Sequence, residues 1–203
     1  MIFIQVNLRL DFFLPASYDS HTLYHPNKEM FAYCLAAAHL KLPHQVAKGF
    51  MVSDVGSFHQ EGWNMLDQYS NRDVCTPGKI PNDHLPHILH YCQRYILGKY
   101  VIGKHRVPED FLSCEQRLLG EPPEDIGEKF NFGIEPDRTV DAKFKIPPKT
   151  VKNHAFMLCH LIPYLNEAAT YWKDNHCAGK IPNKQKSLTF YKDMNVAPHL
   201  FQS

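Results

Sequence analysis

Three histidines in the middle of the sequence have a spacing that first suggests a metal site. His84, His87 and His90 are three residues apart, and Cys92 follows closely. Imidazole and thiolate groups are the usual ligands of zinc. The surrounding residues favour a strand, on which His87 and His90 point to opposite faces, and Pro86 opposes a helix that would bring them together. A zinc site built from all three is therefore disfavoured, and His90 remains a candidate as a single ligand.

The acidic residues offer only a weak metal motif. The sequence contains no Asp-x-Asp pair, the motif that many sugar-nucleotide enzymes use to hold Mn²⁺ on a diphosphate. Glu135 and Asp137 imitate such a pair, but they lie in a proline-rich stretch that is expected on the surface. Gly-x-Gly-x-x-Gly, a phosphate-binding loop ending in Lys-Ser/Thr, and Gly-x-Ser-x-Gly are also absent. The motifs therefore indicate none of these common enzyme classes.

A compact cationic group follows Gly103. Lys104, His105 and Arg106 are consecutive, and cations grouped in this way could bind a diphosphate whose charge grows as it leaves. A solvated turn would have the same composition. The sequence therefore predicts a substrate-binding role for these three residues, with a solvated turn as the alternative.

A long loop over residues 53–73 carries the other candidate binding residues. Trp63 offers an aromatic face that can stack on a sugar ring, and the carboxylates of Glu61 and Asp67 can accept hydrogen bonds from sugar hydroxyls. Long ordered loops are more often functional than simple connections are. The alternative is a tryptophan that fastens the loop to the core.

Composition limits the classes of partner. Of the 203 residues, 44% are hydrophobic and 21% are charged, as expected of a globular chain with a core. The net charge of +1 provides no field that would attract nucleic acid or an anionic membrane. Six cysteines occur without a Cys-x-x-Cys pair, and they permit either up to three disulfides in an oxidising compartment or six separate buried thiols. The six cysteines are Cys34, Cys75, Cys92, Cys114, Cys159 and Cys177.

Periodicity and turn residues predict the elements that must position these groups. Alternation over residues 4–10 predicts a half-buried strand, and this opening stretch is too short and too charged to span a bilayer. We expect a helix over residues 27–42 that Pro43 stops, and a second helix over residues 150–174 that Pro163 kinks. Strands are expected at residues 46–52, 87–95 and 99–106, with a Gly98-centred turn between the last two. Residues 108–148 are expected on the surface with little regular structure, and residues from 178 onward as a loosely held tail.

The serial order of these segments resembles a known family. The helix KEMFAYCLAAAHLKL is followed by AKGFMVSD, then PHILHYCQRY, then GKYVIGKHRVPEDFLSCEQRLLGEPP, and a closing helix ends in NEAATYW. This order is similar to that of the C-terminal part of plant and algal peptidyl serine α-galactosyltransferases and the related hydroxyproline O-arabinosyltransferases. The resemblance covers about residues 27–125 and 150–172, and it rests on the order rather than on one specific motif.

The resemblance implies an α/β chain that forms the C-terminal part of a Rossmann-like GT-A fold. Residues 1–26 would be a poorly matched lead-in, residues 27–177 the glycosyltransferase part, and residues 178–203 a polar tail. It also implies a UDP-sugar donor, a peptide acceptor with Ser or hydroxyproline, Mn²⁺ or another divalent cation, and residence in the Golgi or endoplasmic reticulum. The family's acidic metal motif has no counterpart here, so we expect no sugar transfer by this chain alone. An incomplete sheet with an open edge or face is expected for the same reason.

The resemblance also suggests individual roles. A late histidine often completes the metal site of GT-A enzymes, and this role falls to His90. The family pattern places an acid at Glu29, which would act as a catalytic residue by orienting the acceptor or the donor. The alternative for Glu29 is a favourable charge at a helix N-terminus. Two other interpretations of the whole chain remain: a non-catalytic carbohydrate- or peptide-binding module of the secretory pathway, and a small disulfide-stapled secreted domain with no sugar role.

Overall fold

The chain divides into two compact units, residues 5–47 and a larger unit that contains everything from residue 48 onward. The structure, a computed structural model, describes residues 28–43, 49–57, 61–91, 93–103, 107–134 and 143–188. The strand expected at residues 4–10 therefore lies outside the described residues. The two units are considered separately below.

The smaller unit contains the helix α1, Lys28–His39. The expected helix is confirmed, but it ends three residues before the predicted end. Lys41 has a φ of 51°, and the N–H groups of Lys41 and Leu42 donate to the carbonyls of Ala38 and Ala37 at 3.1 and 2.9 Å. These two bonds form a Schellman motif, which closes a helix without help from the following residues.

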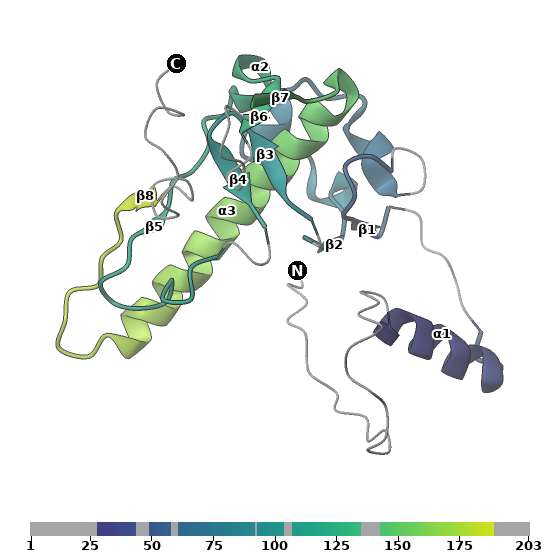
Figure 1. Cartoon of the computed structure of the whole chain (residues 1–203), viewed down its shortest axis with the longest axis horizontal. Helices are drawn as coiled ribbons and strands as arrows, with labels where there is room; N and C mark the ends of the chain where they lie inside the picture. The colour runs from purple at the N-terminus through teal and green to yellow at the C-terminus, as the bar shows by residue number, and fades with distance from the viewer. Residues whose placement is uncertain are drawn as a thin grey trace. The chain divides into compact units, whose positions relative to one another are not determined.

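The larger unit is built on the helix α3, Pro148–His176 (Figure 1). Proline suits the first position of a helix because its missing N–H would have no partner there. The predicted helix is confirmed and extends two residues further at each end. Val151, Leu158, Ile162 and Ala169 of the predicted stripe are buried, and the helix continues through Pro163.

Four two-stranded sheets surround α3 in the described residues. β1 (Met51–Val52) pairs in parallel with β2 (Ile88–Leu89), and β5 (Leu118–Leu119) pairs in parallel with β8 (Lys186–Leu188). The hairpin of β3 (Tyr95–Leu97) and β4 (Tyr100–Ile102) and the pair of β6 (Phe132–Ile134) and β7 (Lys143–Lys145) are antiparallel. Gly98 N–H donates to Phe132 O at 2.7 Å and links these two antiparallel pairs.

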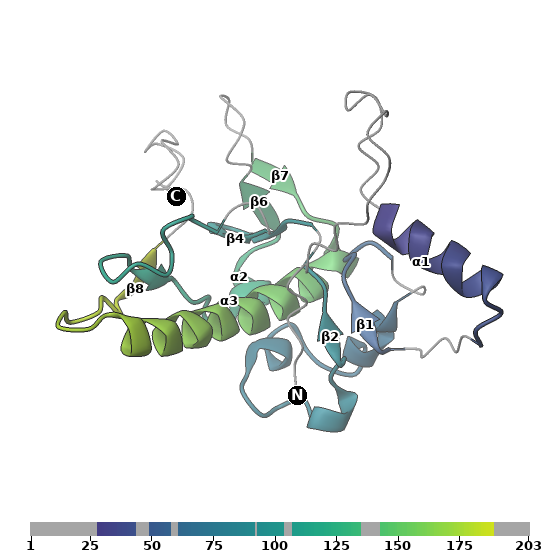
Figure 2. The ribbon, with the colours of Figure 1, turned by 90° about the horizontal axis from the view of Figure 1, so that it is seen from below.

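Short 3-10 helices interrupt the long loop and its continuation. They are η1 (Gly62–Leu66), η2 (Asp73–Cys75) and η3 (Asn82–His84). Figure 2 shows the β3–β4 and β6–β7 pairs along one side of α3, and the segment of the short helices along another. A mixed α/β arrangement is therefore what the described residues form, and a Rossmann-like GT-A sheet stays a prediction.

The predicted continuous strand over residues 87–95 is wrong. β2 ends at Leu89, and the chain then turns before β3 begins at Tyr95. The turn is stabilised because Tyr95 OH and Gln93 Nε2 both donate to Ser53 O, at 2.7 and 3.0 Å. Residues 46–48 of the strand predicted for residues 46–52 lie outside the described residues. In the rest of that segment the strand is β1 alone, and Gly49 adopts a φ of 72° just before it. The Gly98 turn between β3 and β4 is confirmed, with a φ of 54°.

The expectation that residues 108–148 run over the surface is also wrong, although their regular elements are short. This region contains β5, β6, β7 and the short helix α2, Ile126–Lys129. Its apolar residues Leu118, Leu119 and Ile126 are almost fully buried in the core. The segment from residue 178 is expected to be a loosely held tail. It instead pairs with β5 through β8, and Leu118 N–H donates to Gln185 O at 3.0 Å. The apolar residues of the 108–148 region therefore bring it to the core, whereas the tail is held by backbone pairing with β5.

Candidate functional site

The carboxyl ends of the parallel strands β1 and β2 lie beside each other. Val52 pairs with Leu89, so Ser53 and His90 follow the two strand ends at the same edge. Ligands of open α/β sheets often bind at such an edge. His90 is half-buried there, and its backbone N–H donates to Val52 O at 3.0 Å.

Glu61 holds the turn that follows β1. Its carboxylate accepts hydrogen bonds from Ser53 N at 2.5 Å, from Ser53 Oγ at 2.7 Å and from Asp54 N at 3.0 Å. These hydrogen bonds fix the backbone and side chain of the residues that directly follow β1. In this structure, Glu61 therefore organises the loop, and the substrate-binding role predicted for it remains a prediction.

Trp63 fastens the loop to the core. Only 2% of the residue is exposed, its Nε1–H donates to Asp54 O at 2.7 Å, and its ring meets Phe156 edge-on at 6.2 Å. This arrangement matches the alternative interpretation of the sequence, in which the tryptophan fastens the loop to the core. A sugar stacked on the full indole face would need more of the ring exposed than the structure shows.

A surface cavity of about 450 Å³ lies where the η1 segment meets the beginning of α3. Trp63 and Asp67, two of the three predicted loop residues, line it. The other lining residues are Asn64, Leu66, Asn71, Pro148, Lys149, Lys152 and Asn153. A volume of this size is within the range of small-molecule sites. The cavity therefore becomes the main candidate site.

Several polar groups of the cavity are fixed by the surrounding backbone. Asn71 Nδ2 donates to Gly127 O at 3.0 Å, and Asn153 Nδ2 donates to Val55 O at 3.1 Å. Lys152 Nζ donates to Leu66 O at 3.1 Å. These bonds hold the amides and one ammonium group in place before any ligand arrives, which lowers the entropic cost of binding.

Other polar groups of the cavity remain available. Within the described parts of the chain, no residue forms a hydrogen bond or ion pair with the side chains of Asn64, Asp67 or Lys149. Asn64, Asp67 and Lys149 are exposed. The sequence analysis missed Lys149, Lys152 and Asn153, although the Pro147-Pro148 start of a helix followed by two lysines three residues apart was a usable signal.

The remaining predicted residues cannot be placed in a common site. Lys104, His105 and Arg106 lie outside the described residues, as do Glu135 and Asp137. Glu29 belongs to α1, in the smaller unit, and its side chain is not described. Their predicted roles remain predictions.

The histidines that suggested a metal site have separate surroundings. Tyr69 Oη lies 2.8 Å from His84 Nδ1, and His87 stacks on Phe50 at 5.2 Å between ring centroids. Over residues 28–43, 49–57, 61–91, 93–103, 107–134 and 143–188, no three His, Cys, Asp or Glu side chains are grouped to hold a metal ion. These residues do not supply a Mn²⁺ ligand set by themselves, so the cation and the role of His90 remain predictions.

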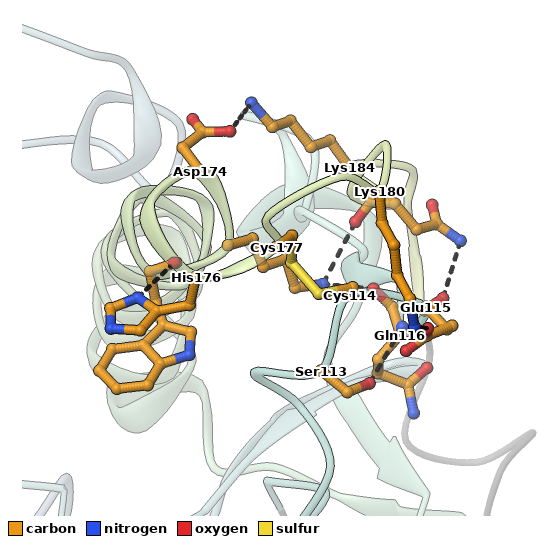
Figure 3. The surroundings of a disulfide bond; sticks show 12 residues. Ser113, Cys114, Glu115, Gln116, Asp174, His176, Cys177, Lys180 and Lys184 are labelled. Carbon is orange, nitrogen blue, oxygen red and sulfur yellow. Dashed lines mark hydrogen bonds and ion pairs between the residues drawn. A yellow bond between two sulfur atoms is a disulfide. The ribbon is translucent and has the colours of Figure 1, made fainter.

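Two disulfides connect the loops to α3. Cys75 of η2 is bonded to Cys159, and Cys114 is bonded to Cys177 at the helix end (Figure 3). Cys34 of α1 is an exposed free thiol.

No protein family, curated protein or solved structure matches this chain. None of the helices in the described regions is both long and apolar enough to cross a bilayer.

Two histidines of α3 have lowered pKa values. Burial lowers the pKa of His154 to about 4, and its Nδ1 accepts a hydrogen bond from Ile96 N–H at 3.2 Å. Burial also lowers the pKa of His160, against the opposing effect of its hydrogen bond with Phe156 O. Both rings are therefore neutral at pH 7 and act as packing and hydrogen-bonding groups.

Proposed function

We propose that this chain is the C-terminal part of a secretory-pathway glycosyltransferase, and that the cavity at the start of α3 binds the sugar of a substrate. The single observation that carries the proposal is the convergence of Asp67 with fixed and available amides on one cavity of about 450 Å³. Carboxylate and amide groups are the usual partners of sugar hydroxyls, and a few such groups on an apolar floor make a typical small-molecule site.

Each polar group has a distinct task in this proposal. Asp67 accepts hydrogen bonds from two hydroxyls, and Asn64 donates and accepts as required. Asn153 is only 4% exposed and is held by Val55 O, so it presents its remaining amide atoms in a fixed direction. Trp63 and Leu66 form the apolar floor. These residues bind and orient a sugar, and they perform no bond-breaking step.

The resemblance of the segment order supplies the reaction class, with a UDP-sugar donor and a peptide acceptor containing Ser or hydroxyproline. The two disulfides support an oxidising compartment such as the endoplasmic reticulum or Golgi lumen. Recovery of the protein from its native source with Cys75, Cys114, Cys159 and Cys177 reduced would oppose this location.

A second candidate is a non-catalytic carbohydrate-binding module. The observation that favours it is the lack of a metal-binding group among the residues that the structure describes. Both candidates use the same cavity, and they differ in whether sugar transfer follows binding.

The test is a titration of the 203-residue chain with free monosaccharides and with UDP-sugars, followed by NMR shifts of the two tryptophan indoles. We expect sugar binding that Asp67→Asn weakens about tenfold, because the carboxylate loses its charge-assisted hydrogen bonds. Asp83→Asn, an equivalent change at another exposed acid, is the matched control. Absence of any sugar binding would refute the proposed site.

A parallel assay follows UDP release with peptides that contain Ser or hydroxyproline. It uses this chain joined to the N-terminal half that the transferase requires, because no transfer is expected of this chain alone. Release that depends on the peptide supports the transferase, and His90→Ala then tests the predicted metal ligand. Sugar binding with no UDP release under any metal condition supports the binding module.

A further inference from the structure

The cavity combines two ammonium groups with one carboxylate. Lys149 and Lys152 line it together with Asp67, so its charged side chains sum to one net positive charge. No carboxylate in the described portion of the sequence forms an ion pair with either lysine. A neutral sugar would leave this positive charge without a partner.

Lys152 is prepared for an anion. The side chain is half-buried, and Nζ is held by the carbonyl of Leu66, a residue that is only 1% exposed. An ammonium group has three donors, so two remain after this bond. A fixed cation next to a cavity binds an anion with less loss of side-chain entropy than a free surface lysine does.

Asn153 supplies an independent indication of a ligand. The residue is 4% exposed, its Nδ2 donates to Val55 O, and nothing in the described stretches donates to its Oδ1. Every fully buried side-chain N or O atom of these stretches has a partner, so Oδ1 is not fully buried, and Asn153 is one of the residues that line the cavity. An acceptor in this position suits a hydroxyl group.

We propose that the ligand of this cavity is an acidic sugar, whose anionic group is held by Lys149 and Lys152 and whose hydroxyls bind Asp67 and Asn153. This inference rests on the proposed sugar-binding function of the cavity. The shared chemistry is a ring with hydroxyls beside one anion, which both a uronic acid and a sugar phosphate offer.

The experiment titrates the 203-residue chain with glucose, glucuronate, glucose 6-phosphate and inorganic phosphate. We expect both acidic sugars to bind about ten times more tightly than glucose and than phosphate alone, because only they use both halves of the cavity. The preference of one acidic sugar over the other identifies the type of anion. Affinity for the acidic sugars should fall as salt rises, whereas affinity for glucose should not.

Lys149→Gln is the key variant, since the side chain forms no bond with the described parts of the protein that folding would need. It should weaken binding of the acidic sugars about fivefold and leave glucose unchanged. Lys145→Gln, an equal change of charge on the exposed strand β7, is the control and should change neither.

The outcomes separate this inference from the function on which it rests. Glucose that binds as tightly as glucuronate, with Asp67→Asn weakening both, would overturn the acidic ligand and leave the sugar site standing. Phosphate that binds as tightly as glucose 6-phosphate would also overturn it, because the hydroxyl partners would then contribute nothing. Absence of all sugar binding would remove both proposals.

Discussion

The two ends of α3 treat their polar side chains in opposite ways. At the N-terminal end, Lys149 forms no bond with the described residues and borders a cavity with Asp67. At the C-terminal end, Asp174 pairs with Lys184 at 2.5 Å and Glu115 pairs with Lys180 at 2.7 Å around the Cys114–Cys177 disulfide (Figure 3).

The contrast is smaller in the interior, because Lys152 near the N-terminal end also donates to a loop carbonyl, that of Leu66. Lys173 is fully buried near the C-terminal end, where its Nζ donates to Gln116 O and Asn183 O. Burial lowers its pKa, while Asp110 and Glu115 act in the opposite direction. Paired polar groups hold loops together, whereas available groups beside a cavity indicate a ligand. Comparable residue types on one helix thus have structural roles at one end and a proposed binding role at the other.

The largest expected effect comes from the disulfide that stabilises the cavity end. Cys75→Ala with Cys159→Ala should lower the free energy of unfolding by about 2–5 kcal/mol, because the crosslink closes a long loop in the unfolded chain. The two cysteines are 84 residues apart. Urea unfolding of the oxidised proteins measures the change, with Cys34→Ala as the control. An unchanged midpoint would show that the crosslink does not stabilise this end.

Lys173→Met tests the paired end. The flexible methionine side chain keeps much of the stem volume but removes the ammonium, so Gln116 O and Asn183 O lose a charged donor. We expect a loss of about 2–3 kcal/mol in urea unfolding. Lys184→Met removes an exposed lysine close by and should cost much less. Equal losses from both changes would mean that the buried Lys173 stabilises the fold no more than the exposed Lys184 does.

Acid should weaken the packing of α3 against β3, where His154 contacts Tyr95 and Ile96. The pKa of His154 is about 4 when folded against 6.5 for the free side chain, so between these values only the unfolded chain takes up the proton. Stability therefore falls as pH falls from 7 toward 4, by about 2 kcal/mol at pH 5 from this residue alone. His154→Gln keeps an acceptor for Ile96 N–H and does not titrate. It should flatten the pH dependence of the urea midpoint, and an unchanged slope would assign the acid sensitivity elsewhere.

The exposed ion pair at the C-terminal end should contribute little. Asp174→Asn removes the charge that faces Lys184, and we expect at most about 0.5 kcal/mol, because solvent screens the pair. High salt should reduce the difference further. A double-mutant cycle with Lys184→Gln measures the coupling. A coupling well above this value would mean that surface pairs, as well as buried Lys173, hold this end together.

The smallest effect is expected at the cavity itself. Lys149→Gln and Asp67→Asn should each change the free energy of unfolding by less than about 0.5 kcal/mol, because neither side chain is bonded to the described residues. Thermal unfolding without ligand is the measurement. Marked destabilisation by either change would show that these cavity side chains stabilise the fold, as the paired side chains at the other end of α3 do.

The helices could be predicted from the sequence because their signals are local. The apolar stripe from Val151 to Ala169 and the prolines at its start specify α3 without knowledge of the rest. The strands could be predicted only in part. β1, β2 and β4 lie within predicted strand segments and β3 begins in one, but they have only two or three residues each, whereas β5 to β8 were not predicted. In the β5–β8 pair, the partner lies far away in the sequence. Leu118, for example, pairs with Lys186. The apolar pair Leu118–Leu119 within charged sequence was the signal that could have shown burial.

The candidate site was only partly predictable, for a physical reason. Lys149 and Lys152 have the sequence of an ordinary solvated first turn, and they border a cavity only because Trp63 holds the η1 segment nearby. Asn166 shows the reverse case. It lies in the Asn-Glu-Ala segment that carries the family resemblance, but its amide bonds Leu119 N–H and C=O at 2.8 and 2.9 Å, as a neighbouring strand would. Its role in this structure is architectural.

The positions of the disulfides also affect how the chain is made. Cys75 and Cys114 leave the ribosome first, and their partners on α3 follow 84 and 63 residues later. At about 5–20 residues per second, both thiols wait for several seconds in the presence of each other and of Cys34. In the oxidising compartment that the proposed function requires, these waiting thiols can pair prematurely during translation. Repair of such pairs by thiol–disulfide exchange can begin only when the last helix has emerged.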